Sequence, residues 1–378
     1  MEKKKKFSWK TVGVILLFWI FCGVIGYFLG IYVDKTFPGA DSGRGELGYL
    51  LFVIGCFLVG IYLQIMIHEG GHLVFGLLTG YEFSSFRVGS VMMVRENGKL
   101  VFRKYSLAGT GGQCLMTPPD MVDGKFPVML YNLGGPLANV IVSAVAFVIF
   151  ALLPLGSLWG NLCLGIAAAG VYLAVLNGIP MRLGGIDNDG RNALSLTKDQ
   201  DAMESFWLQM KVNEQISKGL RLKDMPEEWF AVPSEEAMKN PMVAARAVVA
   251  CNRLVDQKDF SGARELITRL LEAESGMLPL HRRMLTCDQI YLELIGENRE
   301  EVLDQLYTKE LEQFMKSMKT SPTVHRTQYA YYLLHTKDMK KAIQIKEKFE
   351  KTAKTYPYPS DIQSERELME IAENTLNA

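Results

Sequence analysis

The chain has 378 residues, nearly half of them hydrophobic, and its 41 basic and 41 acidic residues balance. This balance argues against nucleic acid as a partner, because nucleic-acid binders carry a basic excess. Charge is sparse in the first half, where it lies between long apolar runs, and frequent in the second half. The pattern predicts a membrane domain, residues 1–197, followed by a cytosolic helical domain, residues 198–378.

The first apolar run, residues 11–33, carries no charge and follows a lysine-rich start at residues 3–6. About 23 helical residues reach roughly 34 Å, which is enough to span a bilayer. A signal peptide is the competing interpretation, but the run is long and no small-residue cleavage site stands out. We therefore expect a retained helix whose N-terminus lies in the cytoplasm, since basic residues favour that side.

The second apolar run begins near Leu47 and leads into His68-Glu69-Gly70-Gly71-His72. Positions i and i+4 share one face of a helix, so His68 and His72 can bind one Zn²⁺ ion, with Glu69 as a candidate general base. A chance match is the alternative for so short a motif. Ionisable groups are costly in lipid, however, and their place at the end of an apolar helix favours a functional site.

The polar segment that follows predicts strands at 82–88, 91–95 and 99–105, with Asn97-Gly98 as a hairpin turn between the last two. Its exposed edge at 99–105 could bind an extended peptide by strand addition. The glycine-rich stretch 106–112 lacks the Lys-Ser/Thr pair of a phosphate-binding loop, which favours a flexible or re-entrant turn near the metal.

Residues 126–181 contain no charge and predict two spans joined by a turn near 154–161. Gly135-Pro136 and Asn139 lie within the third span, where glycine allows close approach and a buried amide needs a partner. An ordinary packing kink explains Gly135-Pro136 equally well. Small residues at 165–170 in the fourth span suit tight helix packing.

A catalytic zinc ion usually has three protein ligands. Asp187 and Asp189 follow the fourth span and are the candidates for the third ligand, although Asp-Asn-Asp-Gly is also ordinary turn and capping chemistry. The remaining histidines lie far down the second half and are expected to be non-ligand residues: His281, His325 and His335.

The order of these motifs resembles the site-2 protease family of intramembrane zinc metalloproteases. The matching segments, within roughly residues 45–195, are His68-Glu69-Gly70-Gly71-His72, Gly135-Pro136-Leu137-Ala138-Asn139, and Asn177-Gly178-Ile179-Pro180 with Asp189-Gly190.

This resemblance implies that His68, His72 and Asp189 bind zinc and that Glu69 activates water. It also implies that Asn139 and Asn177 are polar groups near the active site. The chain has Asn188 where the family pattern has leucine before Asp-Gly, and Asp187 adds a second acid, so the third ligand stays open between Asp189 and Asp187.

The second half is helical in composition and contains a weak repeat with a spacing of about 40 residues, in the range of tetratricopeptide or HEAT arrays. The related segments start at Lys258, Glu297 and Lys337. Such an array offers a concave surface to a protein partner, whereas a plain helical bundle would only stabilise the membrane part. The six cysteines are scattered and are expected to be reduced.

We therefore expect a mainly α, polytopic membrane protein with about four transmembrane helices, a small cytoplasmic β-hairpin insertion and a C-terminal, repeat-like helical domain. The expected function is that of a multi-pass zinc metalloendopeptidase of the cell membrane that cleaves a membrane-bound protein substrate by intramembrane proteolysis. A catalytically silent receptor or scaffold is the alternative. A transporter is a third possibility, although about four spans without a doubled half argue against it.

Overall fold

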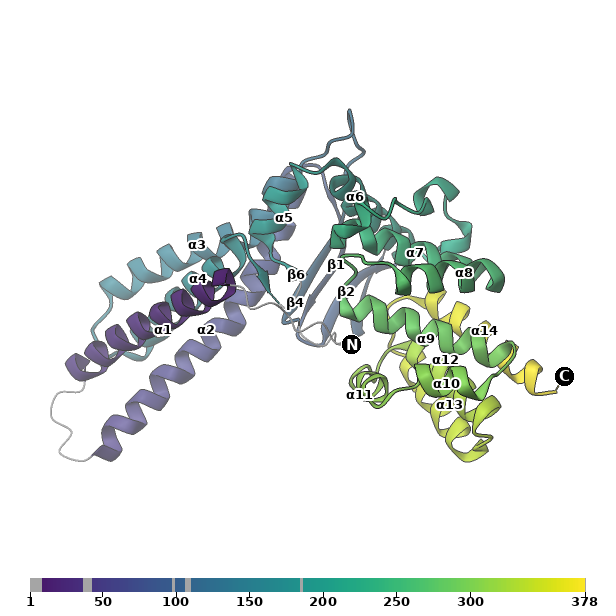
Figure 1. Cartoon of the computed structure of the whole chain (residues 1–378). Coiled ribbons are helices and arrows are strands. Elements are labelled where there is room, and N and C mark those ends of the chain that lie inside the picture. The colour runs from purple at the N-terminus through teal and green to yellow at the C-terminus, as the bar shows by residue number, and fades with distance from the viewer. Residues whose placement is uncertain (1–8, 37–42, 97–98, 106–109, 184–185, 378) are drawn as a thin grey trace. The chain divides into compact units, whose positions relative to one another are not determined.

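The computed structural model describes residues 9–36, 43–96, 99–105, 110–183 and 186–377. The chain is mainly helical, with one four-stranded antiparallel sheet (Figure 1). It divides into two compact units. The first comprises residues 1–64 and 139–173, and the second comprises residues 65–138 and 174–378. The boundary expected at residue 197 stays a prediction.

Along the chain, two long helices come before the sheet, α1 (Trp9–Thr36) and α2 (Gly43–Leu78), and two come after it, α3 (Val128–Leu152) and α4 (Leu158–Gly178). Within the described residues, three helical stretches are long and apolar enough to cross a membrane: Leu47–Leu78 of α2, and all of α3 and α4. Large apolar side chains such as those of Leu58, Val145 and Trp159 are exposed on them, as expected for helices that face lipid. A fourth span at α1 stays a prediction.

Helices α2 and α4 approach closely within the first unit. A Cβ atom added at Gly60 would lie 2.5 Å from the carbonyl oxygen of Gly165, so only glycine permits this contact. The amide of Asn139 on α3 donates to the Gln64 carbonyl at 2.8 Å and to Gln64 Oε1 at 2.7 Å. Gln64 in turn donates to the Ile166 carbonyl at 3.0 Å, so these buried amides satisfy one another inside the apolar unit.

The sheet of the second unit contains β1 (Glu82–Val88), β2 (Val91–Glu96), β3 (Lys99–Lys104) and β4 (Gly112–Thr117) in the order β3-β2-β1-β4. The first three are the predicted strands. The sheet is larger than the predicted hairpin, because β4 pairs with β1 and forms a second edge. The turn Asn97-Gly98 and residues 106–109 lie outside the described residues.

A short ribbon, β5 (Arg182–Leu183) and β6 (Ile186–Asp187), follows α4. The helices after it are α5 (Asp189–Leu196), α6 (Gln200–Ser217), α7 (Pro241–Gln257), α8 (Phe260–Glu272), α9 (Pro279–Ile295), α10 (Glu300–Leu306), α11 (Lys309–Ser317), α12 (Pro322–Ala330), α13 (Met339–Ala353) and α14 (Pro359–Asn377). Single 3-10 or π turns lie between some of them: η1 (Leu222–Asp224), η2 (Glu227–Phe230), η3 (Ala237–Lys239) and η4 (Tyr331–His335).

The weak repeat corresponds to a shared helical turn. Lys258, Asn298 and Lys337 have positive φ angles of 66°, 51° and 53°, and each lies in the turn between the two helices of a hairpin. Asp259 and Asp338 then cap α8 and α13 by accepting a hydrogen bond from a backbone N–H three residues on. The hairpins are therefore real, while their assignment to a named repeat type stays a prediction.

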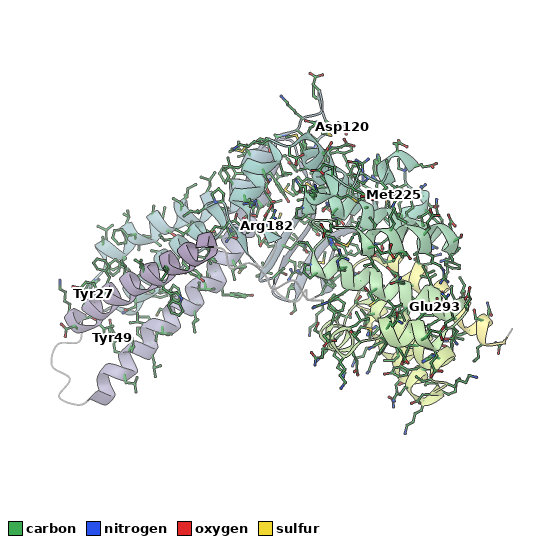
Figure 2. All side chains as sticks on the ribbon, in the orientation of Figure 1. Tyr27, Tyr49, Asp120, Arg182, Met225 and Glu293 are labelled. Carbon is green, nitrogen blue, oxygen red and sulfur yellow. The ribbon has the colours of Figure 1, made fainter. Side chains whose placement is uncertain are left out.

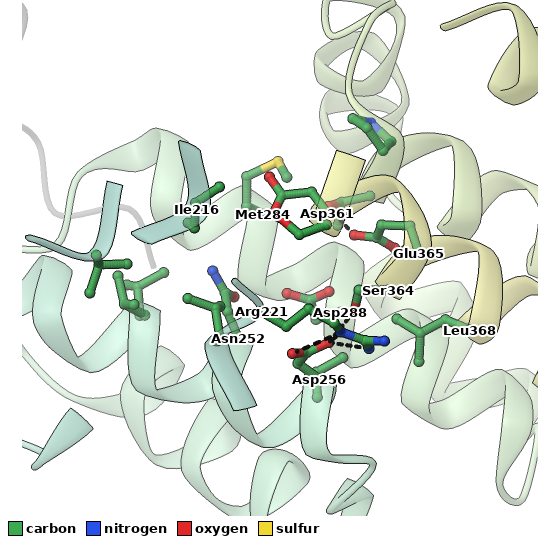
Figure 3. Close-up of a pocket in the computed structure, with 18 of the residues that line it drawn as sticks. Ile216, Arg221, Asn252, Asp256, Met284, Asp288, Asp361, Ser364, Glu365 and Leu368 are labelled. Atoms are coloured by element: carbon green, nitrogen blue, oxygen red, sulfur yellow. Dashed lines mark hydrogen bonds and ion pairs between the residues drawn. The ribbon is translucent and has the colours of Figure 1, made fainter. Parts of the chain in front are cut away.

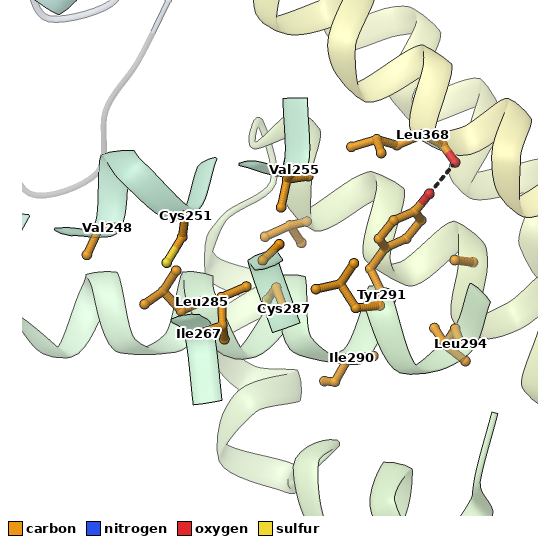
Figure 4. Packing of buried hydrophobic residues seen from close by; sticks show 14 of the residues in the cluster. Val248, Cys251, Val255, Ile267, Leu285, Cys287, Ile290, Tyr291, Leu294 and Leu368 are labelled. Carbon is orange, nitrogen blue, oxygen red and sulfur yellow. Dashed lines mark hydrogen bonds between the residues drawn. The ribbon is translucent and has the colours of Figure 1, made fainter. Parts of the chain in front are cut away.

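The larger of two hydrophobic cores joins α6 to α14, from Val212 to Ala372. Figure 4 shows its centre, where Leu285 and Ile290 of α9 are completely buried. The buried hydroxyl of Tyr291 donates to the Leu368 carbonyl at 2.8 Å, which joins α9 to α14. The five cysteines whose side chains are described have free thiols.

Candidate metal centre

His68 and His72 point from one face of α2 toward Asp189, the first residue of α5. The two Nε2 atoms are 3.2 Å apart. Asp189 Oδ2 lies 3.0 Å from His68 Nε2 and 3.5 Å from His72 Nε2. Both histidines are buried, and all three residues belong to the second unit.

These distances fit a tetrahedral metal ion. With bonds of about 2.0–2.1 Å to nitrogen and oxygen, the ligand atoms of a tetrahedral zinc ion lie roughly 3.3–3.4 Å apart. The three observed distances, 3.0, 3.2 and 3.5 Å, cluster around that value. Three ligands on one side also leave the fourth position open, as in a catalytic site.

A hydrogen bond to the backbone fixes the ring of His72. Its Nδ1 atom donates to the Tyr131 carbonyl on α3 at 2.7 Å. A carbonyl can only accept, so Nδ1 carries the proton and Nε2 presents a lone pair. Asp189 Oδ2 is itself buried with no hydrogen-bond partner among the described residues. Two acceptors that face each other in this way are stabilised by a cation between them.

Asn188 places Asp189 at the start of α5. Its side-chain oxygen accepts hydrogen bonds from the backbone N–H groups of Arg191 and Met181, both at 3.0 Å. Its amide nitrogen donates to carbonyls at the end of α4, those of Leu176 and Ile179, both at 2.6 Å. Asparagine at this position therefore caps one helix and ties it to the preceding one, a role that leucine cannot fill.

Glycines bring α3 against the two histidines. A Cβ atom at Gly135 would lie 2.6 Å from Nε2 of both His68 and His72. A Cβ atom at Gly134 would lie 2.7 Å from the Gly71 carbonyl oxygen, so the two backbones touch. Helix α3 continues through Pro136, and the lack of a side chain at Gly135 is what permits its close approach to the histidines.

Glu69 lies on α2 beside His68, and the first residue of β4 packs against it. A Cβ atom at Gly112 would lie 2.5 Å from Glu69 Cγ and 2.6 Å from its Oε1. The guanidinium group of Arg87 holds this end of β4 by donating to the Gly112 carbonyl at 3.3 Å and to the hydroxyl of Thr110. Arg87 is almost completely buried, so these hydrogen bonds are shielded from solvent.

Asp187 bonds to two arginines and does not belong to the group of residues at the histidines that could hold a metal ion. Its carboxylate accepts from Nε and Nη2 of Arg182, which is labelled in Figure 2, at 2.5 and 3.0 Å, and lies 2.9 Å from Nε of Arg191. Its charge is thus neutralised by protein groups, and it is Asp189 that the structure groups with His68 and His72.

The two predicted polar residues lie on α3 and α4. Asn139 belongs to the first unit and bonds to Gln64, one helical turn before His68 along α2. Asn177 lies in the last turn of α4, where its carbonyl oxygen is 3.2 Å from the Cβ position of Gly190. A role for either side chain in the reaction stays a prediction.

Comparison with known families decides the membership of the chain. A family model described as Peptidase family M50 matches residues 56–357, which is most of the chain. The chain belongs to this family, the site-2 protease family. No curated protein and no solved structure matches it. The M50 match confirms the resemblance found in residues 45–195 and extends it through the helical hairpins. Membership in this family, together with the three apolar helices, supports the role of a membrane metallopeptidase for this chain.

Sequence reasoning missed three residues of this M50 centre: Tyr131, Arg87 and Asn188. Tyr131 lies 59 residues from His72 along the chain, and no local pattern links them. The signal for Asn188 was present in Asn-Asp-Gly, a good capping sequence at the end of an apolar span.

Proposed function

We propose that this chain is an intramembrane zinc endopeptidase that cleaves a transmembrane segment of a membrane-bound protein, as in regulated intramembrane proteolysis. The observation that carries the proposal is the convergence of His68, His72 and Asp189 at tetrahedral spacing, with Glu69 beside them. Two imidazole nitrogens and a carboxylate oxygen form a donor set that suits zinc.

The protein groups divide the chemistry between them. When bound, zinc acts as a Lewis acid that activates water and polarises the scissile carbonyl. Glu69 takes the proton from the attacking water and passes it to the leaving amine. The Tyr131 carbonyl keeps His72 in the tautomer that a ligand needs, and Asn188 keeps Asp189 in reach.

A helical substrate has to unwind before its peptide bond is accessible, and the released backbone groups then need partners. The expected partner was the strand edge at 99–105, but β3 lies at the far edge of the sheet from β4. Strand β4 is the edge that reaches Glu69, so we assign the strand-addition role to it.

The outward backbone groups of β4 follow from its pairing. Gly89 donates to the Gly111 carbonyl at 2.9 Å, so residues 111, 113 and 115 face β1, and Gly112, Cys114 and Met116 face outward. The hydroxyl of Tyr131 donates to the outward Cys114 carbonyl at 2.9 Å. Because the outward carbonyls of Gly112 and Cys114 already accept from Arg87 and Tyr131, a substrate strand would pair with the outward N–H groups of this edge, next to the general base.

The proposed topology places the N-terminus and the helical domain in the cytoplasm, with α1 as a fourth span. The lysines at residues 3–6 favour this orientation. Helix α2 is apolar over 32 residues, about 48 Å, which exceeds the bilayer core of about 30 Å. Its last turns, which carry the histidines, therefore lie toward one membrane surface, where water can reach them.

The test is cleavage of a transmembrane substrate by the purified chain in lipid nanodiscs, with its zinc content measured in parallel. The wild type should hold one zinc ion and cleave. Glu69→Gln should keep the metal and lose cleavage by at least about 100-fold. Full activity of Glu69→Gln would reject the mechanism, and a metal-free, inactive wild type would favour a silent receptor.

A further inference from the structure

The helical domain contains a cavity of about 370 Å³ (Figure 3). Its walls come from α6, α7, α9, α12 and α14 and from the segments that precede η1 and α14. The helices α7, α9 and α12 are the first members of the three hairpins with the shared turn, while their partners α8, α10 and α13 contribute no lining residue. This is how an array of helical hairpins builds a concave inner face.

The charged groups of the wall are mostly paired. Arg221 contacts Asp256 at 2.5 Å and Glu367 at 2.5 Å. Arg326 contacts Asp288 at 2.5 Å and Glu365 at 2.9 Å.

The wall nevertheless carries more negative than positive charge. Two arginines face four carboxyl groups, a surplus of two negative charges when all four acids are ionised: Arg221 and Arg326 against Asp256, Asp288, Asp361 and Glu365. Burial lowers the pKa of His281, so this lining residue stays neutral at pH 7 and does not offset the surplus.

Asp361 is the carboxylate without a counter-charge. Burial, with repulsion from Glu365 and Asp256, raises its pKa to about 7. Three tyrosines lie near enough to interact with its charge, Tyr105, Tyr356 and Tyr358, and the ring centroid of Tyr356 lies 5.7 Å from that of Tyr105 and 5.9 Å from that of Tyr358. A carboxylate among aromatic rings is a favourable environment for a cation.

Two buried polar groups of the wall also lack a hydrogen-bond partner within the described part of the chain, although the guanidinium of Arg326 lies over the ring of Tyr291. They are Nη1 of Arg326, which is 1% exposed, and Oγ of Ser360, which is 5% exposed. An unpaired guanidinium N–H requires an acceptor such as a carbonyl oxygen. The ligand therefore has to supply a positive charge and a hydrogen-bond acceptor together.

The geometry points to a binding site for a short polypeptide segment, held by a lysine or arginine side chain at Asp361 and by a backbone carbonyl at Arg326. The volume lies at the low end of the range of about 300–1,000 Å³ for ligand pockets, so only a short segment enters. The source of the segment rests on the proposed cytoplasmic placement: cytoplasmic flanks of membrane proteins are rich in lysine and arginine.

Binding is measured by fluorescence anisotropy on the full chain in detergent, with Glu69→Gln as the background so that no cleavage interferes. The probe is a labelled, acetylated and amidated peptide of glycine, alanine and serine with one central lysine. The matched probe carries norleucine, which keeps the alkyl chain and removes the charge. Because binding is read without proteolysis, its failure is distinguishable from failure of the protease proposal.

The lysine peptide should bind, and the norleucine peptide should bind at least about tenfold more weakly. Asp361→Asn, an isosteric change, should weaken the lysine peptide by a similar factor. Asn252→Asp, a surface change that adds a negative charge to the wall, should strengthen it. Asp304→Asn on α10 is the matched control, since Asp304 is exposed and does not line the cavity.

Equal binding of the two peptides, or no effect of Asp361→Asn, would overturn the proposal. Free lysine amide that competes as well as the peptide would also overturn it, because the site would then take a small cation and not a polypeptide.

Discussion

The centre on α2 and the cavity of the helical domain both gather buried polar groups, but they satisfy them differently. At the centre, lone pairs of His72 and Asp189 face each other, and no cationic side chain among the described residues lies between them. In the cavity, each arginine contacts two carboxylates, and the wall has more acidic than basic groups. Convergent acceptors at metal spacing indicate an ion, whereas a paired network with a surplus acid indicates an organic cation.

The largest expected effect separates the two aspartates near the centre. Asp189→Ala should lose the metal and reduce cleavage by at least about 100-fold, because an acid ligand is removed. Asp187→Asn should keep both, since Asp187 is engaged by Arg182 and Arg191. Metal analysis and single-turnover cleavage of both variants measure this. Retention of zinc by Asp189→Ala would break the comparison by showing that the three residues are not a ligand set.

The next effect tests how closely α3 approaches the histidines. Gly135→Ala places a methyl group 2.6 Å from both imidazoles and should reduce metal affinity by about 10- to 100-fold. Gly70→Ala is the matched control on the same motif, because a Cβ atom there meets nothing within 4 Å. Zinc titration with a competing chelator distinguishes them. If both glycines tolerate alanine equally, the backbone contact does not shape the site.

Much of the centre could be predicted from the sequence, because its signals are local. The i, i+4 spacing gave His68 and His72, and the end of the fourth span limited the third ligand to Asp187 or Asp189. Choosing between them required knowledge of where Arg182 and Arg191 point. The contact of Tyr131 with His72 joins segments far apart in the chain, and no periodicity encodes it.

The fold shows the same division. Strands β1, β2 and β3 have β-branched and aromatic residues and a hairpin signal, and they were predicted nearly to the residue. Strand β4, Gln113-Cys-Leu-Met-Thr after two glycines, has little intrinsic strand preference and exists because β1 offers an edge. The cavity was equally hidden, since it forms only when helices from α6 to α14 come together.

A smaller effect distinguishes the two edges of the sheet. Cys114→Pro removes an outward N–H group from β4, and Phe102→Pro is the matched change on β3. The N–H of Tyr105 donates to the Ser90 carbonyl, so Tyr105 faces β2, and by alternation the backbone N–H of Phe102 faces outward. Cleavage should fall by about tenfold for the first and remain near wild type for the second. Zinc content checks that both variants fold. Equal losses would remove the assignment of substrate binding to β4.

The smallest effect concerns stability. Unlike the preceding variants, which lower metal binding or cleavage, Asp361→Asn in the cavity should raise the free energy of unfolding at high pH. The pKa of Asp361, about 7 in the folded chain, exceeds the value of about 3.9 in an unfolded chain. Its contribution is therefore fully present below about pH 4 and is lost as the pH rises through 7. Asp361→Asn stays neutral, so it should match wild type near pH 4 and be more stable at pH 8. Partial exposure of the carboxyl group to the cavity limits the gain to about 1–2 kcal/mol.

Hydrogen exchange of α14 at the two pH values, with Asp304→Asn as control, measures the difference. A gain at pH 8 means that the chain retains an acid that costs it stability, as expected for a residue that serves a ligand. A loss at pH 8 means that Asp361 already has a protein partner and that the cavity, unlike the centre on α2, is electrostatically complete.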